Sequence, residues 1–257
     1  MPPMNDPLRP VVLAYTAVCE ALSAAAIGRN RRDPDGTVLA VSGAPVATLN
    51  AVISPNLEPS PEAVEALAGD PSLTALPWSI QVRGVPGQSV TEVAAQHGLT
   101  SVTAQPLMIR RPDAGPPPQP VDGPLHVRRV HGDELGLYAE TMARGFSVPR
   151  EVFEVFADPA LAKTEGFTFY LAEVDGIPVG TGMAATLGDL LGVFNISVLP
   201  HHRRRGHGRA ITLEIVRAGY AVGATTAYLY ASAMGEPVYA SAGFHTEEVL
   251  TSFTAPS

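Results

Sequence analysis

The chain has 257 residues, of which 46% are hydrophobic and 16% charged, and its formal net charge is −8. This composition suits one large globular domain or two small ones. The single cysteine, Cys19, excludes an internal disulfide and a multi-cysteine metal site, and no apolar run reaches the roughly eighteen residues of a membrane span. The negative charge argues against nucleic acid as a principal partner, because contacts to phosphates need clustered cations.

The first 110 residues predict an α/β arrangement. Residues 1–10 do not build the basic and then apolar order of a signal peptide, so we expect a cytoplasmic protein. Apolar residues at helical spacing or in alternation predict the elements that follow. These are a helix at 11–27, strands within 37–53, a helix at 60–67 that begins with Ser-Pro-Glu, a strand at 78–82, a helix at 90–96 that ends at Gly98, and a strand at 103–110.

A proline-rich segment separates this half from the rest of the chain. Residues 112–124 are too rich in proline for a helix or a central strand, and they predict an extended, semi-rigid linker. We therefore expect an N-terminal α/β domain at residues 1–110, a linker at 111–124 and a second domain at 125–257.

The second half predicts a mixed sheet. Antiparallel strands come first, with a hairpin turn at Asp175-Gly176, and a βαβ-like crossover comes later. The predicted strands are 125–130, 167–174, 178–184, 192–199, 226–230 and 247–254, and the predicted helices are 133–144, 148–156, 208–222 and 236–242.

The stretch 193–210 has the pattern of a phosphate-binding turn between a strand and a helix. Apolar and polar residues alternate at its start, Pro200 ends the strand, and apolar residues at helical spacing follow from Ile211. The start of a helix leaves N–H groups without partners at the positive end of the macrodipole, so it attracts a phosphate. Gly206 and Gly208 let a ligand approach the backbone. The stretch predicts a site for a phosphorylated cofactor.

Two familiar phosphate-binding motifs fit this stretch poorly. A dinucleotide-binding Gly-x-Gly-x-x-Gly would need a third glycine where Ile211 stands. A P-loop would need Gly-Lys-Ser/Thr, and the one lysine of the chain is Lys163.

The sequence resembles the GNAT superfamily of acyl-CoA-dependent N-acyltransferases. The matching segments are Arg203-x-x-Gly206-x-Gly208, the strand residues before it and residues 235–244 after it. The resemblance covers roughly residues 125–257 and implies an α/β fold with a mixed α+β sheet, and it implies acetyl-CoA as the acyl donor. No metal is expected.

The resemblance also implies a set of cofactor-binding residues. Backbone N–H groups across 204–209 would hold the pyrophosphate, with arginines adding charge, and the pantetheine arm would pair with the main chain of 196–198. The expected cofactor-binding residues are Ile196, Ser197, Val198, Arg203, Arg204, Arg205, Gly206, His207, Gly208, Arg209 and Ser232. Tyr239 is the expected general acid, which protonates the departing thiolate.

The sequence does not identify the general base or the residues of the acceptor pocket. Many relatives carry a glutamate where Gly192 stands and an asparagine where Ser232 stands. Asp189 and Glu173 are candidate bases, although each is more often a solvated surface carboxylate. The helices at 133–156 are expected to recognise the acceptor. Their aromatic residues line a pocket or belong to the core, and these residues are Phe146, Phe153 and Phe156.

Short internal similarities point to a duplication. Residues 50–55 are similar to 195–200, and 95–108 are similar to 241–253, but no Arg-x-x-Gly-x-Gly follows the first segment. The N-terminal half is therefore either a degenerate GNAT-like domain or unrelated.

Three functions remain in view. The first is an acetyl-CoA-dependent N-acetyltransferase acting on a primary amine of a small molecule, with a protein amino group as the second choice. The alternative is a non-catalytic acyl-CoA-binding or regulatory module. A nucleotide-binding domain unrelated to CoA is the third.

Overall fold

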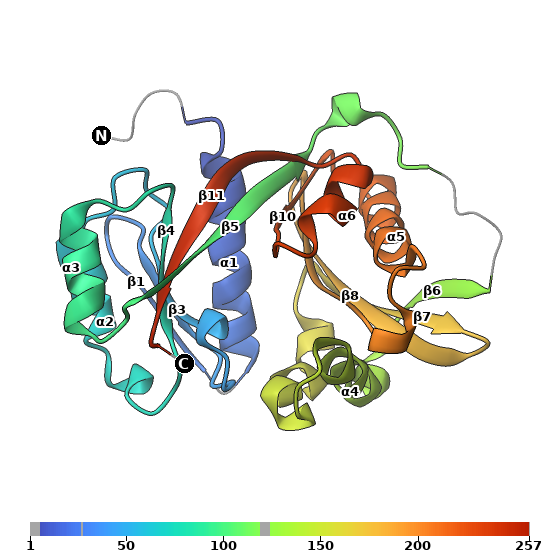
Figure 1. Cartoon of the computed structure of the whole chain (residues 1–257), viewed down its shortest axis with the longest axis horizontal. Helices are drawn as coiled ribbons and strands as arrows, with labels where there is room; N and C mark the ends of the chain where they lie inside the picture. Colours follow the sequence, from blue (N-terminus) through green and yellow to red (C-terminus); the bar gives the residue numbers. More distant parts are fainter. Residues whose placement is uncertain (1–5, 27, 119–123, 257) are drawn as a thin grey trace. The chain divides into compact units, whose positions relative to one another are not determined.

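The structure is a computed structural model of the chain and describes residues 6–26, 28–118 and 124–256. The chain divides into two compact units (Figure 1). One comprises Met1–Leu107 together with Glu248–Ser257, and the other comprises Met108–Glu247.

The first unit is a sheet with α1 on one face and α2 and α3 on the other (Figure 1). Its strand order is β1-β2-β3-β4-β11-β5, and α2 connects β3 to β4, which pair in parallel. The elements are α1 (Arg9–Ala25), β1 (Arg29–Arg32), β2 (Val38–Val41), β3 (Asn50–Ile53), α2 (Pro61–Ala68), β4 (Ser79–Arg83), α3 (Gln88–Gln96), the first part of β5 (Ser101–Arg110) and the last part of β11 (His245–Thr254).

Apolar residues of α2, α3 and the strands form the core of this unit. Their spacing at i, i+3 and i+4 in the helices places them on one helix face, where they bury against the sheet. They include Leu39, Val52, Val64, Leu67, Ile80, Val82, Val93 and Phe253.

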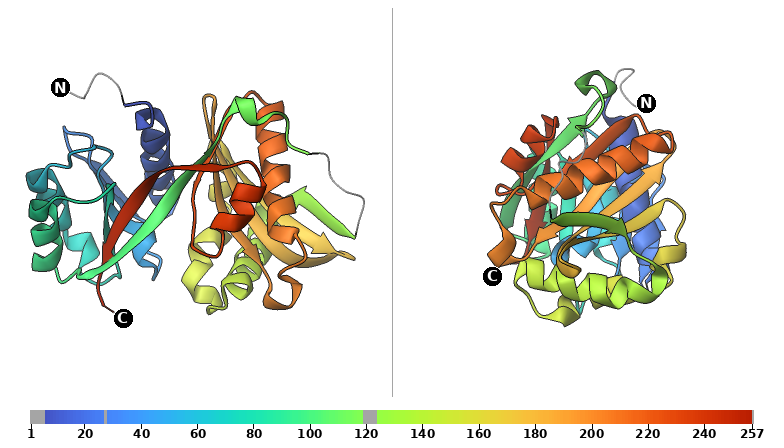
Figure 2. Two further views of the ribbon diagram at one scale, coloured as in Figure 1. Left: turned by 45° about the horizontal axis from the view of Figure 1, so that its top comes forward. Right: turned by 90° about the vertical axis from the view of Figure 1, so that its right-hand side faces the viewer.

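The second unit is a mixed sheet with α4 and α5 on opposite faces (Figure 2, right). Its strand order is β5-β10-β9-β8-β7-β6, in which β9 and β10 are parallel and β6 to β9 are antiparallel. The elements are the end of β5, β6 (Leu125–Arg129), α4 (Leu135–Phe146), β7 (Phe167–Val174), β8 (Ile177–Leu187), β9 (Leu190–Val198), α5 (His207–Ala221), β10 (Thr226–Tyr230), α6 (Glu236–Ser241) and the start of β11.

Small residues let α5 approach the sheet closely. A Cβ atom on Gly182 would lie 2.6 Å from Ile215 Cδ1, and one on Gly180 would lie 3.0 Å from Ile211 Cδ1. The glycines therefore admit the isoleucines of α5 to the space that side chains of β8 would otherwise fill.

The unit boundaries differ from the predicted domain boundaries. The division falls within β5 and within β11 rather than at the proline-rich segment, and residues 248–257 join the first unit. The reason is that the last part of β11 pairs with β4, from Leu250 opposite Arg83 to Thr254 opposite Ser79. Within the predicted linker, Pro112–Ala114 is a short 3-10 helix, and residues 119–123 lie outside the described residues.

Two elements differ from the sequence prediction. The strand β1 was not predicted, because its residues Arg-Asn-Arg-Arg are exposed and carry no alternation. The predicted helix at 148–156 is a 3-10 segment over Arg150–Ala157, with a non-helical backbone at Phe153. Pro149 and the β-branched and aromatic residues of this short segment disfavour a regular α-helix.

Candidate functional site

The strands β9 and β10 separate partway along their length. Their parallel pairing consists of Thr226 opposite Leu190, Ala227 opposite Leu191 and Tyr228 opposite Gly192. The part of β9 from residue 193 to 198 therefore has an edge that β10 does not cover. In an open α/β sheet, ligands bind at the carboxyl ends of strands that diverge in this way.

A β-bulge lies in this uncovered part of β9. The register with β8 shifts between Thr181 and Met183, so β9 holds one additional residue there. Asn195 adopts the left-handed backbone conformation, with φ of 53°, and its carbonyl oxygen accepts a hydrogen bond from Thr181 Oγ1 at 2.9 Å. Of the predicted residues, Ile196 lies in this bulge, and Ser197 and Val198 follow it.

The loop between β9 and α5 presents a row of free amides. In the described part of the chain, no group accepts a hydrogen bond from the backbone N–H groups of residues 204–209. Arg204 and Gly206 are left-handed, with φ of 59° and 80°, and Gly206 caps the helix without a side chain. Neither Gly206 nor Gly208 has a neighbouring atom close enough to obstruct a ligand. Six consecutive donors at the positive end of a helix form an anion-binding site.

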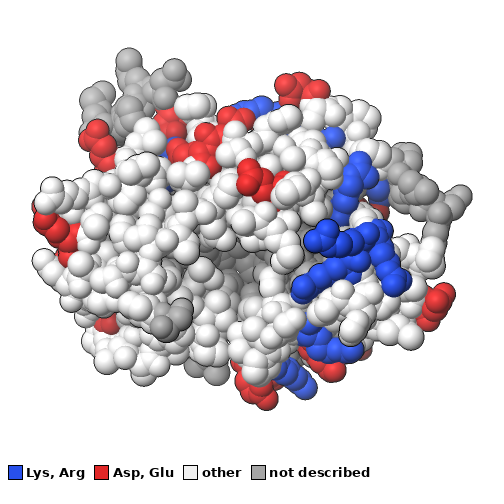
Figure 3. Space-filling view, viewed as in Figure 1, with Lys and Arg blue, Asp and Glu red and all other residues white. Residues whose placement is uncertain are grey.

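The four arginines of the loop divide into two kinds. Arg203 donates from Nε to the carbonyl oxygen of Val198 at 3.1 Å and from Nη2 to that of Gly145 at 2.6 Å, and Arg209 donates to the carbonyl of Ser241 at 3.1 Å. Arg204 and Arg205 are exposed, and neither has an ion pair with any described residue. Arg203 thus anchors the loop, and its expected part in binding the cofactor stays a prediction. Figure 3 shows basic side chains gathered near the start of α5.

Two histidines lie at the same loop. The ring centroids of His202 and His207 are 6.3 Å apart, and Nδ1 of His202 is buried without a hydrogen-bond partner. Burial lowers the pKa of His207, and the nearby His202 and Arg205 lower it further. His207, at the variable position of the motif, is therefore neutral at pH 7 in the free protein.

Tyr239 lies on α6, with Pro237 in the first turn of that helix. Its ring packs against Phe244 at a centroid distance of 6.2 Å. The hydroxyl makes no hydrogen bond to a described residue, and burial raises the pKa of Tyr239 to about 12. The phenol is therefore protonated at every physiological pH and has a free proton to donate.

The helix α6 lies next to the loop between β9 and α5 and next to the end of β9. A Cβ atom on Gly208 would lie 3.8 Å from Val238 of α6 and 3.9 Å from Val198 of β9. Ser232 precedes α6, and its Oγ accepts a hydrogen bond from the N–H of Gly235 at 3.2 Å. A Cβ on Gly235 would clash with the ring of Tyr239 at 2.8 Å, so Ser232 and Tyr239 flank the same glycine. The hydroxyl of Ser232 supports the turn that carries the tyrosine.

These features agree with the family comparison. Residues 165–246 match the family model of the GNAT acetyltransferase domain. Residues 165–246 thus form a domain of the GNAT acetyltransferase type. No curated protein matches the sequence.

Solved structures share the GNAT fold with this chain. A GCN5-related N-acetyltransferase from Kribbella flavida has a TM-score of 0.72 and 19% identity over 99% of this chain and 97% of its own. A conserved protein of unknown function from Staphylococcus epidermidis has a TM-score of 0.62 and 12% identity, over 89% of this chain and 94% of its own. A GCN5-related N-acetyltransferase from Sphaerobacter thermophilus has a TM-score of 0.52 and 22% identity, over 70% of this chain and 61% of its own. The first two matches extend over both units, as a tandem of two GNAT-like units requires.

The GNAT position that often holds a glutamate is closed in this chain. A Cβ on Gly192 would lie 2.7 Å from Cζ of Phe194 and 3.0 Å from Cζ of Tyr228, whose rings are themselves in edge contact at 6.0 Å. The alternative bases are also engaged or distant. Glu173 pairs with Arg128 at 2.9 Å, and Asp189 is exposed just before β9 begins, at the strand end opposite the loop.

The aromatic residues of the acceptor region divide between core and surface. Phe156 is buried, Phe153 is half-buried, and Phe146 is 46% exposed. Phe146 and Phe153 are in ring contact at 5.5 Å. Phe146 directly follows Gly145, where a Cβ would lie 2.8 Å from Cβ of Ser197. The close contact at Gly145 thus places the end of α4, where Phe146 stands, against the uncovered part of β9.

The corresponding crossover of the first unit lacks such a row of free amides at the start of its helix. Pro61 has no N–H, Ser60 Oγ accepts from the N–H of Ala63 at 3.1 Å, and Glu62 adds a negative charge to the first turn of α2. The order β3-α2-β4 with a parallel pair repeats β9-α5-β10, which supports a duplicated and degenerate first unit.

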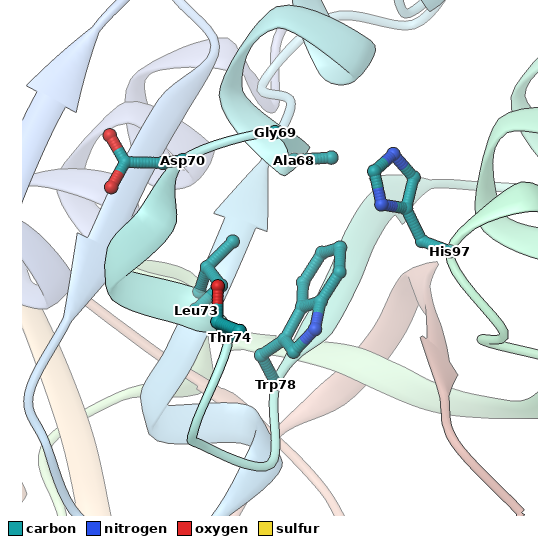
Figure 4. A pocket seen from close by; sticks show the side chains of 7 residues that line it. All are labelled: Ala68, Gly69, Asp70, Leu73, Thr74, Trp78 and His97. Carbon is teal, nitrogen blue, oxygen red and sulfur yellow. The ribbon is translucent and has the colours of Figure 1, made fainter.

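The first unit contains a shallow cavity that sequence reasoning did not predict. Its volume is about 260 Å³, and Trp78 and His97 face each other across one side of it (Figure 4). These two rings are in edge contact at 5.6 Å, and His97 pairs with Glu65 at 3.0 Å. The described residues hold no group of three metal-ligating side chains and no helix able to cross a membrane.

Proposed function

We propose that this chain is an acetyl-CoA-dependent N-acetyltransferase that acetylates a primary amine of a small molecule. The observation that carries the proposal is the run of six backbone N–H groups at 204–209 without partners in the described protein. Such donors suit the diphosphate of CoA, because hydrogen bonds to a charged group stabilise a complex by about 1.5–3 kcal/mol each. The cytoplasmic location expected from the sequence stays a prediction.

The residues of the loop would share the work of holding the diphosphate. The amides bind the phosphate oxygens, and the exposed guanidinium groups of Arg204 and Arg205 add charge-assisted contacts. Arg203 and Arg209 hold the loop to the ends of β9 and α6 through main-chain carbonyls. This division keeps the amides in place before the ligand arrives, which lowers the cost of ordering them.

The uncovered edge of β9 suits the amide-rich pantetheine arm. The N–H of Leu199 donates to Val179 on β8, so the N–H of Val198 points to the opposite edge of the strand. That edge faces the gap left by β10, where a ligand amide can pair as an added strand.

Tyr239 supplies the proton for the leaving thiolate. Acetyl-CoA contributes a thioester, whose carbon is attacked by the neutral amine and whose sulfur leaves as a thiolate. The phenol hydroxyl of Tyr239 is free and protonated, so it can donate to the developing sulfur anion. A positioned acid contributes about 10²–10⁴ in rate.

The amine must reach the site as the free base. Because Phe194 and Tyr228 fill the position of the family glutamate, we propose that water, rather than a carboxylate of β9, takes the proton from the ammonium form. The value of kcat/KM should then rise with pH up to the pKa of the acceptor amine itself.

A second candidate is a non-catalytic acyl-CoA-binding module. The aromatic closure at Gly192 favours it, since a site without a carboxylate base can bind CoA without turning it over.

Thiol release from acetyl-CoA over a panel of primary amines separates the two functions. An enzyme releases CoA with some amine and loses at least tenfold in kcat on Tyr239→Phe, with little change in CoA affinity. Tyr220→Phe is the matched control, because the hydroxyl of Tyr220 bonds the carbonyl of Arg110. CoA binding without release for any amine would establish the binding module instead.

A further inference from the structure

A buried polar cluster lies beneath the bulge of β9. Thr181 is fully buried, and its Oγ1 lies 2.9 Å from the carbonyl oxygen of Asn195 and 2.7 Å from Oγ of Ser197. Thr181 has one hydroxyl proton, which it donates to Asn195, so the second contact is donated by Ser197. The side chain of Ser197 is therefore committed to the protein, and only its main chain can serve a ligand.

The contact to Asn195 fixes the direction of one peptide group. In a trans peptide the carbonyl of Asn195 and the N–H of Ile196 point in opposite directions. Since the carbonyl points toward Thr181 on β8, the N–H of Ile196 points away from β8, toward the edge that β10 leaves uncovered. Asn195 and Ile196 have no partner in the register of β8 and β9, so the ladder does not fix this peptide.

The other groups around Asn195 do not hold its carbonyl. The side-chain amide of Asn195 donates to Met183 Sδ at 3.7 Å, a weak acceptor. The hydroxyl of Tyr138 is buried near the side chains of Asn195 and Thr181 and is not bonded to that carbonyl. The left-handed φ of 53° at a non-glycine residue is strained, and such a conformation persists where its surroundings hold it.

We propose that Thr181 is a positioning residue for acyl transfer. Resting on the function proposed above, it holds the Asn195–Ile196 peptide so that the N–H of Ile196 meets the thioester carbonyl oxygen and stabilises the negative charge that develops there. Removing a single donor of this kind in an enzyme lowers kcat by about 10²–10³. Thr181 acts through the peptide and does not touch the substrate.

The test replaces Thr181 by valine, which keeps the shape and removes the hydroxyl. We expect Thr181→Val to lower kcat at least tenfold, to leave the Kd of CoA within threefold, and to reduce the preference of the protein for acetyl-CoA over CoA. Thr181→Ser, which keeps the donor, should return kcat to within threefold of the unchanged protein. Thr16→Val is the matched control, because Thr16 is also buried and donates to a main-chain carbonyl, that of Leu13, on α1 of the first unit. It should keep kcat within twofold.

The outcomes separate this proposal from the proposed function. If the unchanged protein transfers acetyl groups and Thr181→Val keeps kcat within twofold, or Thr181→Ser is as slow as Thr181→Val, the positioning role is wrong and the function stands. If CoA binding falls in step with kcat, Thr181 supports the fold rather than the chemistry, and the positioning role is again wrong. If the unchanged protein transfers no acetyl group to any amine, both proposals fail. Should Thr181→Val not fold, Thr181→Cys is measured in its place against the same limits.

Discussion

Nη2 of Arg203 lies 2.6 Å from the carbonyl oxygen of Gly145, and Nε of the same guanidinium bonds Val198. One side chain thus joins the phosphate-binding loop to the end of α4 and to the end of β9. The first arginine of the motif fixes the positions of the amides that follow it. Arg204 and Arg205, whose side chains make no such bond to a described residue, are left to meet a ligand.

Arg203 and Arg204 should therefore differ in what their loss does. Arg203→Ala removes two hydrogen bonds from a charged donor, so we expect a lower melting temperature together with a loss of at least tenfold in CoA affinity. Arg204→Ala removes only an exposed charge, so it should leave the melting temperature unchanged and weaken CoA binding about threefold at low salt, less at high salt. Thermal unfolding and calorimetric titration with CoA measure both effects. Equal behaviour of the two variants would contradict the anchoring role.

Gly206 should matter for the ligand as well as for the backbone. Gly206→Ala introduces a side chain at φ of 80°, which costs about 1–2 kcal/mol of stability, and it places a methyl group beside the free amides. Gly223→Ala is the control, since Gly223 has φ of 109°, follows the other end of α5 and has open space around it. Both variants should lose similar stability in urea. Only Gly206→Ala should lose CoA affinity, by tenfold or more, and retention of that affinity would argue against phosphate binding at this loop.

His207 should couple CoA binding to pH. Its pKa in the free protein is below the ordinary value of about 6.5, so its imidazolium is disfavoured there, and stability decreases as pH falls below that value. A diphosphate next to the ring would stabilise the imidazolium and raise the pKa, so CoA binding would take up a proton. The measured quantity is the CoA affinity of the unchanged protein divided by that of His207→Gln. We expect this ratio to be at least threefold larger at pH 5.5 than at pH 7.5. His201→Gln, an exposed neighbour in the same loop, should show no such trend, and a ratio independent of pH for His207→Gln would exclude this coupling.

A buried ion-pair network should stabilise the first unit. Arg83 on β4 has a side chain 1% exposed and bonds Asp6 at 2.5 Å and Glu248 at 2.9 Å, which ties β11 to β4. Arg83→Met leaves two carboxylates unpaired and should cost about 3–5 kcal/mol. The hydrogen bond from Arg83 lowers the pKa of Asp6, so this contribution is complete above about pH 4 and is lost as pH falls below it.

Urea unfolding followed by tryptophan fluorescence measures this effect, because the one tryptophan, Trp78, lies in the first unit. Arg32→Met is the control, since Arg32 pairs with Glu20 at the surface with 41% of its side chain exposed, and it should cost less than about 1 kcal/mol. A cost for Arg83→Met as small as that of the control would show that the buried network does not hold β11.

Local patterns were sufficient to predict most of the elements. The strand Phe167–Val174 and the strand Thr226–Tyr230 were predicted with the bounds that the structure has, because alternation and turn residues mark both ends. The loop and helix at 203–221 follow from glycine positions and helical spacing, which are also local. The GNAT resemblance rests on the same residues.

Long-range relationships could not be read in this way. The pairing of β11 with β4 joins residues about 170 positions apart. The sequence of neither strand predicts which other strand it pairs with. The guanidinium of Arg203 reaches Gly145 from 58 positions away, so its anchoring role was not foreseen. The closure of Gly192 by Phe194 depends on the packing against Tyr228, a property of the folded sheet.

The central claim is that the backbone amides of residues 204–209 hold the diphosphate of CoA. Hydrogen–deuterium exchange measures these amides directly, since a free N–H exchanges rapidly and one bonded to a phosphate oxygen does not. The account predicts rapid exchange across 204–209 in the free protein and marked protection on addition of saturating CoA, with the already bonded turns of α2 unchanged. Saturating CoA that leaves the exchange of 204–209 as it was, or protects a different segment instead, would contradict it.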